Sequence, residues 1–497
     1  MLPVMIGVAA ALVAGYGGWR PSLWYDEAAT ISATDRTVAQ MWRLVEHVDS
    51  VHAAYYLMVR GWTAVFGFSE FSVRAPSALA VGAAAGLLVV VGRRLWDNRF
   101  GVIVAVVFVT LPRVGWAGVE ARSYASTMLL AVAATLVLLI ALDRGRWWWV
   151  GYTALVVASG LWFFLAVALI VGHVGVVVAV RYRSGCRWLP RGYLVATGVA
   201  VLLLCPYGVW VFGQRDQVSW IPATTFRTLG TFALFEYPNG SWAYLLAALV
   251  VLIGGTVVAA TVRVDAHWRV AAVALAWWLA PAIVVVGFSW LGSAIYTPRY
   301  LAFTVPGLAI GIAWAVRQLT RGRRWATVLV VGVVVVVAIP DYLAQRGPYG
   351  RFGGTDFSQV ADYVGAHARP GDCVAFGSSP SWSPVSQRVI ARAKPADFAG
   401  LRDVGARVSA DRAGALWDVD KPVTAYRSFA QTCAVMWVLT DRDRARAARL
   451  FPGGTLYWHF EPFRFADSAL YRELAAAGLR IDRQIPFNNS QVVEMRR

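Results

Sequence analysis

The chain has 497 residues, of which 58% are hydrophobic, and it carries a formal net charge of +18. A mean hydropathy of +0.55 and several apolar runs of at least ~18 residues, the length of a transmembrane helix, exclude a soluble enzyme with a single anchor. The arginines cluster in short loops between these runs, so we expect a lipid bilayer and no nucleic acid as partner.

The apolar runs predict about eleven transmembrane helices. The first run has no basic segment before it and no clear cleavage site, which favours a retained helix over a signal peptide. The stretch 147–180 is too long for one crossing of a ~30 Å hydrocarbon core, so we place a break near Ser159 and Gly160. The expected spans are 2–18, 75–92, 100–116, 124–142, 147–162, 163–180, 192–212, 241–262, 270–290, 299–316 and 325–340.

Arginine is abundant after every even-numbered span. The positive-inside rule places these loops, and with them the N-terminus, in the cytoplasm. The first outward loop, 19–74, and everything after residue 340 then lie on the extracytoplasmic side of the plasma membrane. The arginines that set this orientation are Arg93, Arg94, Arg99, Arg144, Arg146, Arg181, Arg183, Arg187, Arg191, Arg263, Arg269, Arg317, Arg321, Arg323 and Arg324.

The outward loop 19–74 holds two helix candidates, Val38–Val45 and Ala53–Phe66, which we expect to lie in the membrane interface. Residues 341–497 are polar and long enough to form a domain with its own core. Their pattern predicts helices at 357–368, 443–450 and 468–477 and strands at 372–376 and 434–439. The expected fold is a polytopic α-helical membrane part, 1–340, followed by an extracytoplasmic α/β domain, 341–497.

Four cysteines occur, and none forms a Cys-x-x-Cys pair, which argues against a cysteine zinc site. Cys373 and Cys433 both lie in the C-terminal region. They can form a disulfide if that region faces an oxidising compartment, but the sequence leaves their pairing open.

Polar residues gather at the outward ends of the predicted spans, and such convergence on one membrane face indicates a site. Each residue also has a structural interpretation. Helix-end arginines often only snorkel, the acidic pair Asp26 and Glu27 can cap a helix, and Glu70 and Arg74 have the spacing of a structural ion pair. The other members are Asp49, His52, Tyr55, Tyr56, Glu120, Arg122, Tyr124, Gln214, Arg215, Trp220, Pro222, Tyr296, Arg299 and Tyr300.

Six short elements follow one another over roughly the first 310 residues. Together they resemble the GT-C superfamily of polytopic glycosyltransferases, in particular the polyprenyl-phosphate-dependent protein mannosyltransferases and aminoarabinose transferases. After His52 the chain lacks both prolines of the family element, so the local backbone can differ there. The elements are Trp24-Tyr25-Asp26-Glu27-Ala28, Asp49 with His52-Ala53-Ala54-Tyr55-Tyr56, Glu70 with Arg74-Ala75-Pro76-Ser77, Glu120-Ala121-Arg122-Ser123-Tyr124-Ala125, Trp220-Ile221-Pro222 and Pro298-Arg299-Tyr300-Leu301.

The resemblance implies transfer of a sugar from a polyprenyl-phosphate donor to a hydroxyl of a glycolipid, glycan or protein outside the cytoplasm, with inversion at the anomeric carbon. By motif position Asp26 would be the base, and Glu27 would orient Asp26 or bind the acceptor. Arginine suits forked phosphate recognition. The donor and substrate-binding candidates are Arg299, Arg122, Arg215, His52, Tyr300, Tyr56 and Glu120.

We expect no cofactor. An acidic pair can bind a divalent cation, but arginine alone can neutralise a phosphate leaving group. Arginine stands in place of nearly all lysine, which indicates a GC-rich, actinobacterial-type genome. Cell envelopes of that type use polyprenyl-phosphate-mannose widely, so mannose is the expected sugar, and arabinofuranose is the alternative. A transporter of lipid-linked or polar substrates is the alternative of another class, but transporters place polar residues near the bilayer midplane and often repeat their halves. A non-catalytic scaffold would not need Asp26 and Glu27.

Overall fold

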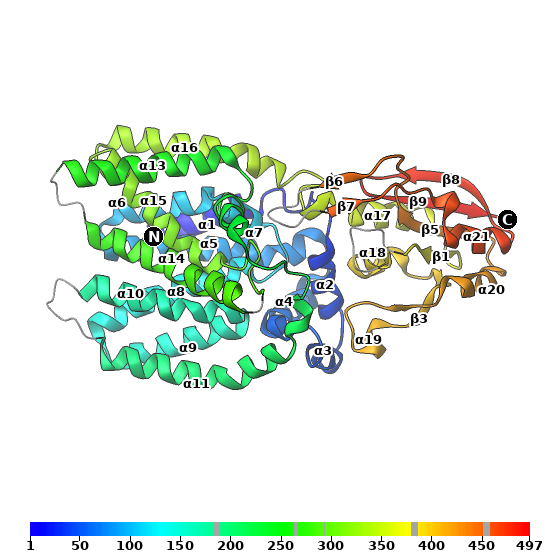
Figure 1. Ribbon diagram of the computed structural model, residues 1–497, viewed down its shortest axis with the longest axis horizontal. Coiled ribbons are helices and arrows are strands. Elements are labelled where there is room, and N and C mark those ends of the chain that lie inside the picture. The colour runs from blue at the N-terminus through cyan, green and yellow to red at the C-terminus, as the bar shows by residue number, and fades with distance from the viewer. Residues whose placement is uncertain (182–188, 263–266, 293, 379–385, 451–457) are drawn as a thin grey trace.

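The computed structural model describes residues 1–181, 189–262, 267–292, 294–378, 386–450 and 458–497. A bundle of long helices carries, at one end, a domain built on a small β-sheet, and the C-terminus lies at the far edge of that domain (Figure 1). This is the polytopic helical architecture with a C-terminal α/β domain that the sequence predicts. Arg183, Arg187, Arg263 and Cys186 lie outside the described residues.

Every predicted span coincides with a helix or a pair of helices. Within the described ranges, eight are long and apolar enough to cross a membrane, or nine if the bent pair α6–α7 counts as one span. Helices α1 and α9 have only 14 and 16 residues, so the count of eleven crossings stays a prediction. The helices are α1 Leu2–Gly15, α5 Glu70–Leu95, α6 Asn98–Thr110, α7 Pro112–Gly118, α8 Tyr124–Arg144, α9 Trp147–Trp162, η2 Phe164–Ala168, α10 Leu169–Arg181, α11 Arg191–Gly213, α13 Trp242–Thr261, α14 Trp268–Leu291, η6 Ala302–Thr304, α15 Val305–Leu319 and α16 Arg324–Ala344.

Two interruptions of the bundle have local causes. Helices α6 and α7 meet at 69°, because Pro112 lacks the amide hydrogen that a continuous helix would need. The break in the stretch 147–180 lies at Phe163, whose backbone is extended, and not at Gly160. Gly160 stays helical and packs closely, since a Cβ there would lie 2.6 Å from the Leu204 side chain.

Small residues bring α1 against α5. A Cβ on Gly82 would lie 2.6 Å from both the Ala11 Cβ and the Gly7 carbonyl oxygen, and one on Gly86 would lie 2.8 Å from the Pro3 carbonyl. Such close backbone approach is typical of membrane helix pairs. The contact fixes the end of α1 beside the start of α5, and the segment between α1 and α2 begins there.

The loop 19–74, which the sequence predicts to face outward, folds into four short helices. These are α2 Tyr25–Thr34, α3 Val38–Val45, η1 Ser50–His52 and α4 Ala53–Phe66, so α3 and α4 have the predicted bounds. A capping box between Thr37 and Gln40 starts α3. Between α11 and α13 lie η4 Arg215–Val218, α12 Phe226–Thr231 and the one-turn π-helix η5 Phe232–Glu236.

The C-terminal domain is a mixed five-stranded sheet in the order β2-β1-β5-β9-β8. Strand β1 runs parallel to β2 and β5, whereas β9 is antiparallel to β5 and β8. Helices α17 and α18 cover one face and α20 and α21 cover the other. The strands are β1 Cys373–Phe376, β2 Arg402–Asp403, β3 Ala406–Val408, β4 Val419–Asp420, β5 Val435–Asp441, β6 Ala448–Leu450, β7 Trp458–Phe460, β8 Arg480–Pro486 and β9 Ser490–Arg496.

The helices of this domain are α17 Phe357–His367, α18 Val389–Ala393, α19 Ala410–Ala413, α20 Tyr426–Ala430 and α21 Ala469–Ala476, with 3-10 turns η7 Phe352–Gly354, η8 Pro395–Phe398, η9 Val423–Ala425 and η10 Phe465–Asp467. A disulfide joins Cys373 of β1 to Cys433, with their Cα atoms 5.9 Å apart. The pairing that the sequence left open is therefore present.

The helix predicted at 443–450 is wrong. Arg444 instead pairs with Phe463 in an antiparallel bridge, and β6 pairs with β7. The Asp443 carboxylate accepts hydrogen bonds from the Phe465 amide (2.8 Å) and the Gln491 side chain (2.6 Å). These long-range partners override the helix propensity of a run rich in arginine and alanine.

One hydrophobic core joins the bundle to the sheet domain. Leu23, Ala28 and Ile31 of the first outward loop pack with Phe357 of α17 and Val389 of α18. Helix α2 therefore lies between the bundle and the sheet domain (Figure 1). The start of α2 carries the acidic pair, so the site is built where the two parts of the chain meet.

Candidate active site

Asp26 and Glu27 lie in the first turn of α2. The Trp24 carbonyl accepts the first helical hydrogen bond, from Ala28 (2.8 Å), and the helix dipole favours carboxylates at this end. Neighbouring helix residues differ in direction by about 100°. The Asp26 side chain consequently keeps 15% of its surface exposed, whereas the Glu27 side chain is fully buried.

Glu27 is a structural anchor. Its carboxylate receives two hydrogen bonds from the Arg74 guanidinium (2.7 and 2.6 Å) and one from the Ala121 amide (3.0 Å). The pair predicted between Glu70 and Arg74 is wrong, because Arg74 turns to Glu27 while Glu70 meets Lys394 of the sheet domain (3.2 Å). Glu27 thus connects α2, α5 and the loop before α8.

Asp26 faces two arginines from distant parts of the chain. Its Oδ2 lies 3.3 Å from Nη2 of Arg299 and 3.9 Å from Nε of Arg122. Arg299 belongs to the segment before η6, and Arg122 to the loop between α7 and α8. Both arginines are almost fully buried. The structure therefore brings together three of the residues that the sequence singled out, and we call Asp26, Arg122 and Arg299 the charged cluster.

The backbone at Arg299 is strained, with a φ of 93° that non-glycine residues rarely adopt. Glu236, at the end of η5, holds this turn: its carboxylate accepts hydrogen bonds from the amides of Arg299 (3.1 Å) and Leu301 (3.2 Å) and from the Tyr296 hydroxyl (3.0 Å). Burial raises the pKa of Glu236, and the Arg113 guanidinium opposes that shift.

Sequence reasoning missed Glu236. The available signal was its isolation, because it is the one glutamate of the loop 213–240, which the sequence predicts to face outward. A buried lone carboxylate needs several donors, and here backbone amides supply two of them.

Aromatic groups surround the Arg299 guanidinium. Its Nε donates to the Tyr124 hydroxyl (3.0 Å). The rings of Trp24 and Phe352 lie 5.6 and 5.4 Å from its central carbon, within the range of cation–π attraction. Tyr300 follows Arg299 directly and sets its ring edge-on to Phe163, with centroids 5.4 Å apart.

Arg122 is held by a second polar chain. Its Nη1 donates to the Tyr56 hydroxyl (3.0 Å), which itself donates to Asp49 (2.7 Å). His52 stacks near Phe163, and its buried Nδ1 has no hydrogen-bond partner among the described residues. Burial lowers the pKa of His52, and the positive charges of Arg122 and Arg299 lower it further. Both effects favour the neutral form of the His52 imidazole beside the charged cluster.

Glu120 supports the site from behind. It accepts a hydrogen bond from the Trp24 indole (2.9 Å) and forms a fully buried ion pair with Arg351. Burial raises the pKa of Glu120, and the Arg351 guanidinium opposes this. Arg351, which no sequence motif indicated, lies in the segment that leads from α16 to the sheet domain.

Arg215 is not part of the charged cluster. Its side chain is exposed on η4, and its guanidinium lies over the Phe212 ring, 4.7 Å from the centroid. Within the described residues, no hydrogen bond or ion pair connects it to Asp26, Arg122 or Arg299. Arg215 lies at the start of η4, the short turn after α11, with its side chain exposed. The sequence showed only that an arginine follows a predicted span, not where its side chain lies.

A cleft of about 580 Å³ opens between the bundle and the sheet domain and reaches Arg299. Arg113, Arg351 and Phe352 also line it. Chemically, the two buried guanidiniums can bind an anion, and the partly exposed carboxylate beside them can accept a proton. In the part of the chain that is described, no three His, Cys, Asp or Glu side chains gather as a metal site; metal independence stays a prediction.

Comparisons with known proteins point to one fold. Residues 53–210 match the family model of dolichyl-phosphate-mannose-protein mannosyltransferases. ArnT from Cupriavidus metallidurans is similar over 99% of this chain and 97% of its own, at 14% identity, with TM-scores of 0.58 in the apo state and 0.57 bound to undecaprenyl phosphate. The arabinofuranosyltransferase AftD from Mycobacteria has a TM-score of 0.51 at 14% identity; the match covers all of this chain and 39% of AftD. No protein of curated function matches the chain in sequence.

Proposed function

We propose that this chain, which has the fold of the GT-C glycosyltransferases, moves a sugar from a polyprenyl-phosphate donor to a hydroxyl of a cell-envelope glycolipid, glycan or protein outside the cytoplasm. The superfamily resemblance of its motifs is confirmed by the family model and by the likeness of the whole chain to ArnT. The observation that carries the proposed activity is the charged cluster, in which Asp26 lies 3.3 Å from Arg299.

The cluster suits a phosphate leaving group. Arg122 and Arg299 are buried and already fixed by Tyr56, Tyr124 and Glu236, so little reorganisation is needed when charge develops on the phosphate oxygens. Forked guanidinium donors match phosphate geometry. His52, whose buried Nδ1 has no hydrogen-bond partner within the described ranges of the chain, lies beside them.

In the proposed reaction, the donor phosphate takes the place of the Asp26 carboxylate as partner of the two arginines. Asp26 then accepts the proton of the acceptor hydroxyl while that oxygen attacks the anomeric carbon. The bond between the anomeric carbon and the phosphate oxygen breaks, and polyprenyl phosphate leaves with its electron pair. A single displacement with one base inverts the anomeric centre. Glu27 acts as a positioning residue for α2.

The donor class is supported by the relatives. ArnT was observed with undecaprenyl phosphate, and the matching family model is that of the dolichyl-phosphate-mannose-protein mannosyltransferases. We propose mannose as the sugar and retain arabinofuranose as the second candidate, because AftD, an arabinofuranosyltransferase, shares the fold. The polar residues lie where the bundle meets the sheet domain, which fits an enzyme acting at a bilayer surface better than a transporter with a midplane site.

The test compares wild type with Asp26→Asn, using purified protein, polyprenyl-phosphate-[14C]mannose or the corresponding arabinofuranose donor, and envelope glycolipid as acceptor. We expect sugar transfer to fall by about 10²–10⁴-fold, the usual contribution of a general base, with an unchanged unfolding temperature. Asp143→Asn is the matched control, because Asp143 forms an exposed ion pair with Arg94. Wild-type turnover by Asp26→Asn would rule out Asp26 as the base.

A further inference from the structure

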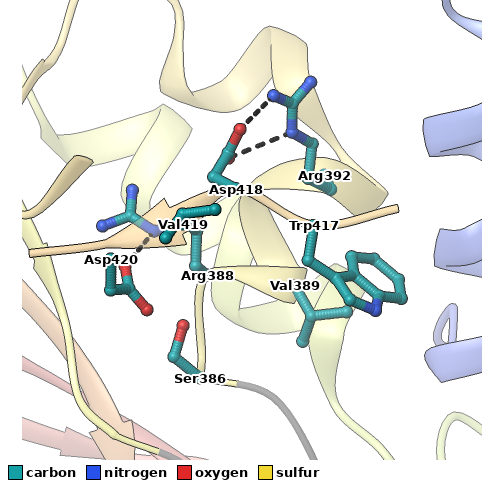
Figure 2. A pocket seen from close by; sticks show the side chains of 8 residues that line it. All are labelled: Ser386, Arg388, Val389, Arg392, Trp417, Asp418, Val419 and Asp420. Atoms are coloured by element: carbon teal, nitrogen blue, oxygen red, sulfur yellow. Dashed lines mark hydrogen bonds and ion pairs between the residues drawn. The ribbon is translucent and has the colours of Figure 1, made fainter. Parts of the chain in front are cut away.

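A second cavity, of about 320 Å³, lies in the sheet domain. Its walls come from α18 and from the segment that leads into β4, with Trp417 at one side and Ser386 at another (Figure 2). Nothing in the proposed reaction uses this cavity. Its volume is at the low end of the ~300–1,000 Å³ of small-molecule sites, which suits one or two sugar rings.

The charges that line the cavity are balanced. Arg392 Nε donates to Asp418 (3.1 Å), and Arg388 Nε donates to Asp420 (2.5 Å) (Figure 2). Arg388 also pairs with Asp403. An ionic ligand would have to displace one of these partners, whereas a neutral ligand need not. Carboxylates and guanidiniums keep spare acceptor and donor positions after pairing, so the walls can hydrogen-bond hydroxyl groups.

Trp417 supplies the aromatic surface that such a ligand needs. Trp417 is one of the residues that line the cavity (Figure 2), and the hydrocarbon faces of sugar rings pack well against indoles. The same ring lies against Tyr25, with centroids 5.1 Å apart, and its Nε1 donates to the Tyr25 hydroxyl (3.1 Å). An aromatic plane beside paired planar side chains is a combination that favours a carbohydrate over a phosphate or a metal ion.

The cavity is fixed to the helix that carries the proposed base. Tyr25 directly precedes Asp26. Further along α2, the Ser32 hydroxyl donates to the Leu416 carbonyl (2.6 Å). Just beyond the helix, Arg36 meets the Ala415 carbonyl (2.5 Å) and Asp411 (3.2 Å). A glycan held against Trp417 would therefore have a defined position relative to Asp26.

We propose that this cavity is an acceptor subsite for a neutral glycan, which presents its next hydroxyl to Asp26. The inference rests on the proposed function and narrows its acceptor from a glycolipid, glycan or protein to a chain bearing neutral sugars. The subsite adds affinity and orientation for the acceptor and makes no contact with the donor phosphate.

The test uses the purified full-length protein on a printed array of neutral manno- and arabino-oligosaccharides, together with transfer kinetics. We expect wild type to bind at least one of these glycans. Trp417→Ala should weaken that binding and raise the acceptor KM by tenfold or more, with an unchanged donor KM, and Trp417→Phe should restore part of the loss. Phe429→Ala, which removes an exposed ring of the same domain outside the cavity, should behave as wild type.

Two further variants separate the subsite from other effects. Tyr25→Phe removes the hydroxyl that Trp417 contacts but leaves the cavity lining intact, so glycan binding should persist. Ser386→Trp should block the cavity and reproduce the loss seen with Trp417→Ala, which guards against misfolding of either variant.

Absence of glycan binding by wild type, or wild-type binding and acceptor KM in both Trp417→Ala and Ser386→Trp, would overturn the subsite. Glycan binding that depends on Trp417 in a protein that turns over neither donor would instead refute the proposed transfer of these sugars, and the cavity would then be a glycan-binding site without an acceptor role.

Discussion

Arg299 combines an unusual backbone with a central side chain. Its φ of 93° is held by Glu236, and its guanidinium reaches Asp26. Replacing it with alanine should therefore affect the donor more than the acceptor. We expect Arg299→Ala to lower kcat/KM for the polyprenyl-phosphate donor by about 100-fold or more, in line with loss of one preorganised donor to an oxyanion.

The matched control for this change is Arg215→Ala. Arg215 occupies a similar place in the sequence pattern, but its side chain is exposed and contacts Phe212, so its removal should leave donor kinetics near wild type. Equal losses from the two variants, or a loss confined to the acceptor KM in Arg299→Ala, would contradict the assignment.

His52 predicts a pH dependence of stability. Burial and the nearby arginines lower its pKa below the ordinary 6.5. As the pH falls through 6.5, His52 therefore takes up a proton in the unfolded chain before it does so in the folded protein. The unfolded state then binds more protons, and stability must fall as the pH drops below about 6.5. We expect His52→Asn to flatten the dependence of the unfolding temperature between pH 5 and 6.5.

His367→Asn serves as the comparison, because His367 is an exposed histidine at the end of α17. Its unfolding temperature should follow the wild-type pH profile. An unaltered slope in His52→Asn would show that this imidazole is already protonated or exposed in the folded protein.

Motifs predicted the members of the charged cluster better than local spacing did. Asp26, Arg122 and Arg299 belong to three separate elements, and they meet in space. The i, i+4 spacing of Glu70 and Arg74 was misleading because a buried arginine takes the partner that satisfies most of its donors, and Glu27 offers two oxygens. Glu236 and Arg351 form contacts across long stretches of chain that no local pattern records.

At the scale of elements, the pair α1–α5 depends on the absence of side chains. We expect Gly82→Ala to destabilise the protein by about 1–3 kcal/mol, the usual cost of overpacking, because the new Cβ would lie 2.6 Å from Ala11 and Gly7. Gly198→Ala in α11, where a Cβ would meet nothing within 4 Å, is the control. Thermal unfolding in detergent measures both, and equal unfolding temperatures would argue against this close helix contact.

Elements with a strong periodic or apolar signal were predictable. The helices at Val38–Val45 and Ala53–Phe66 occur with the expected bounds. The strand expected at 434–439 overlaps most of β5, Val435–Asp441. The run 443–450 has helix-forming residues but lies extended, because pairing with Phe463 and hydrogen bonds to Asp443 exceed a propensity of a few tenths of a kcal/mol per residue. Such tertiary competition is invisible in sequence.

For the whole molecule, cysteine labelling tests the orientation in the membrane. Loop arginines predict that the turn after α15 is cytoplasmic and that the sheet domain is outside. In a background of Cys186→Ser and Cys205→Ser, a membrane-impermeant maleimide applied to intact cells should label Arg412→Cys but not Arg321→Cys, since both positions are exposed. Permeabilised cells should label both, and the reverse pattern in intact cells would invert the topology.

The buried pair of Glu120 and Arg351 has a consequence for recombination between relatives. Arg351 also donates to the Val119 carbonyl (2.9 Å), so the segment before the sheet domain packs against Val119 and Glu120, behind Trp24. The division at residue 340 that we propose is thus a boundary of composition and not a seam at which halves can be exchanged. A chimaera made to exchange acceptor specificity would have to keep α2, residues 119–122 and the segment 349–356 together, because separating them would disrupt the charged cluster.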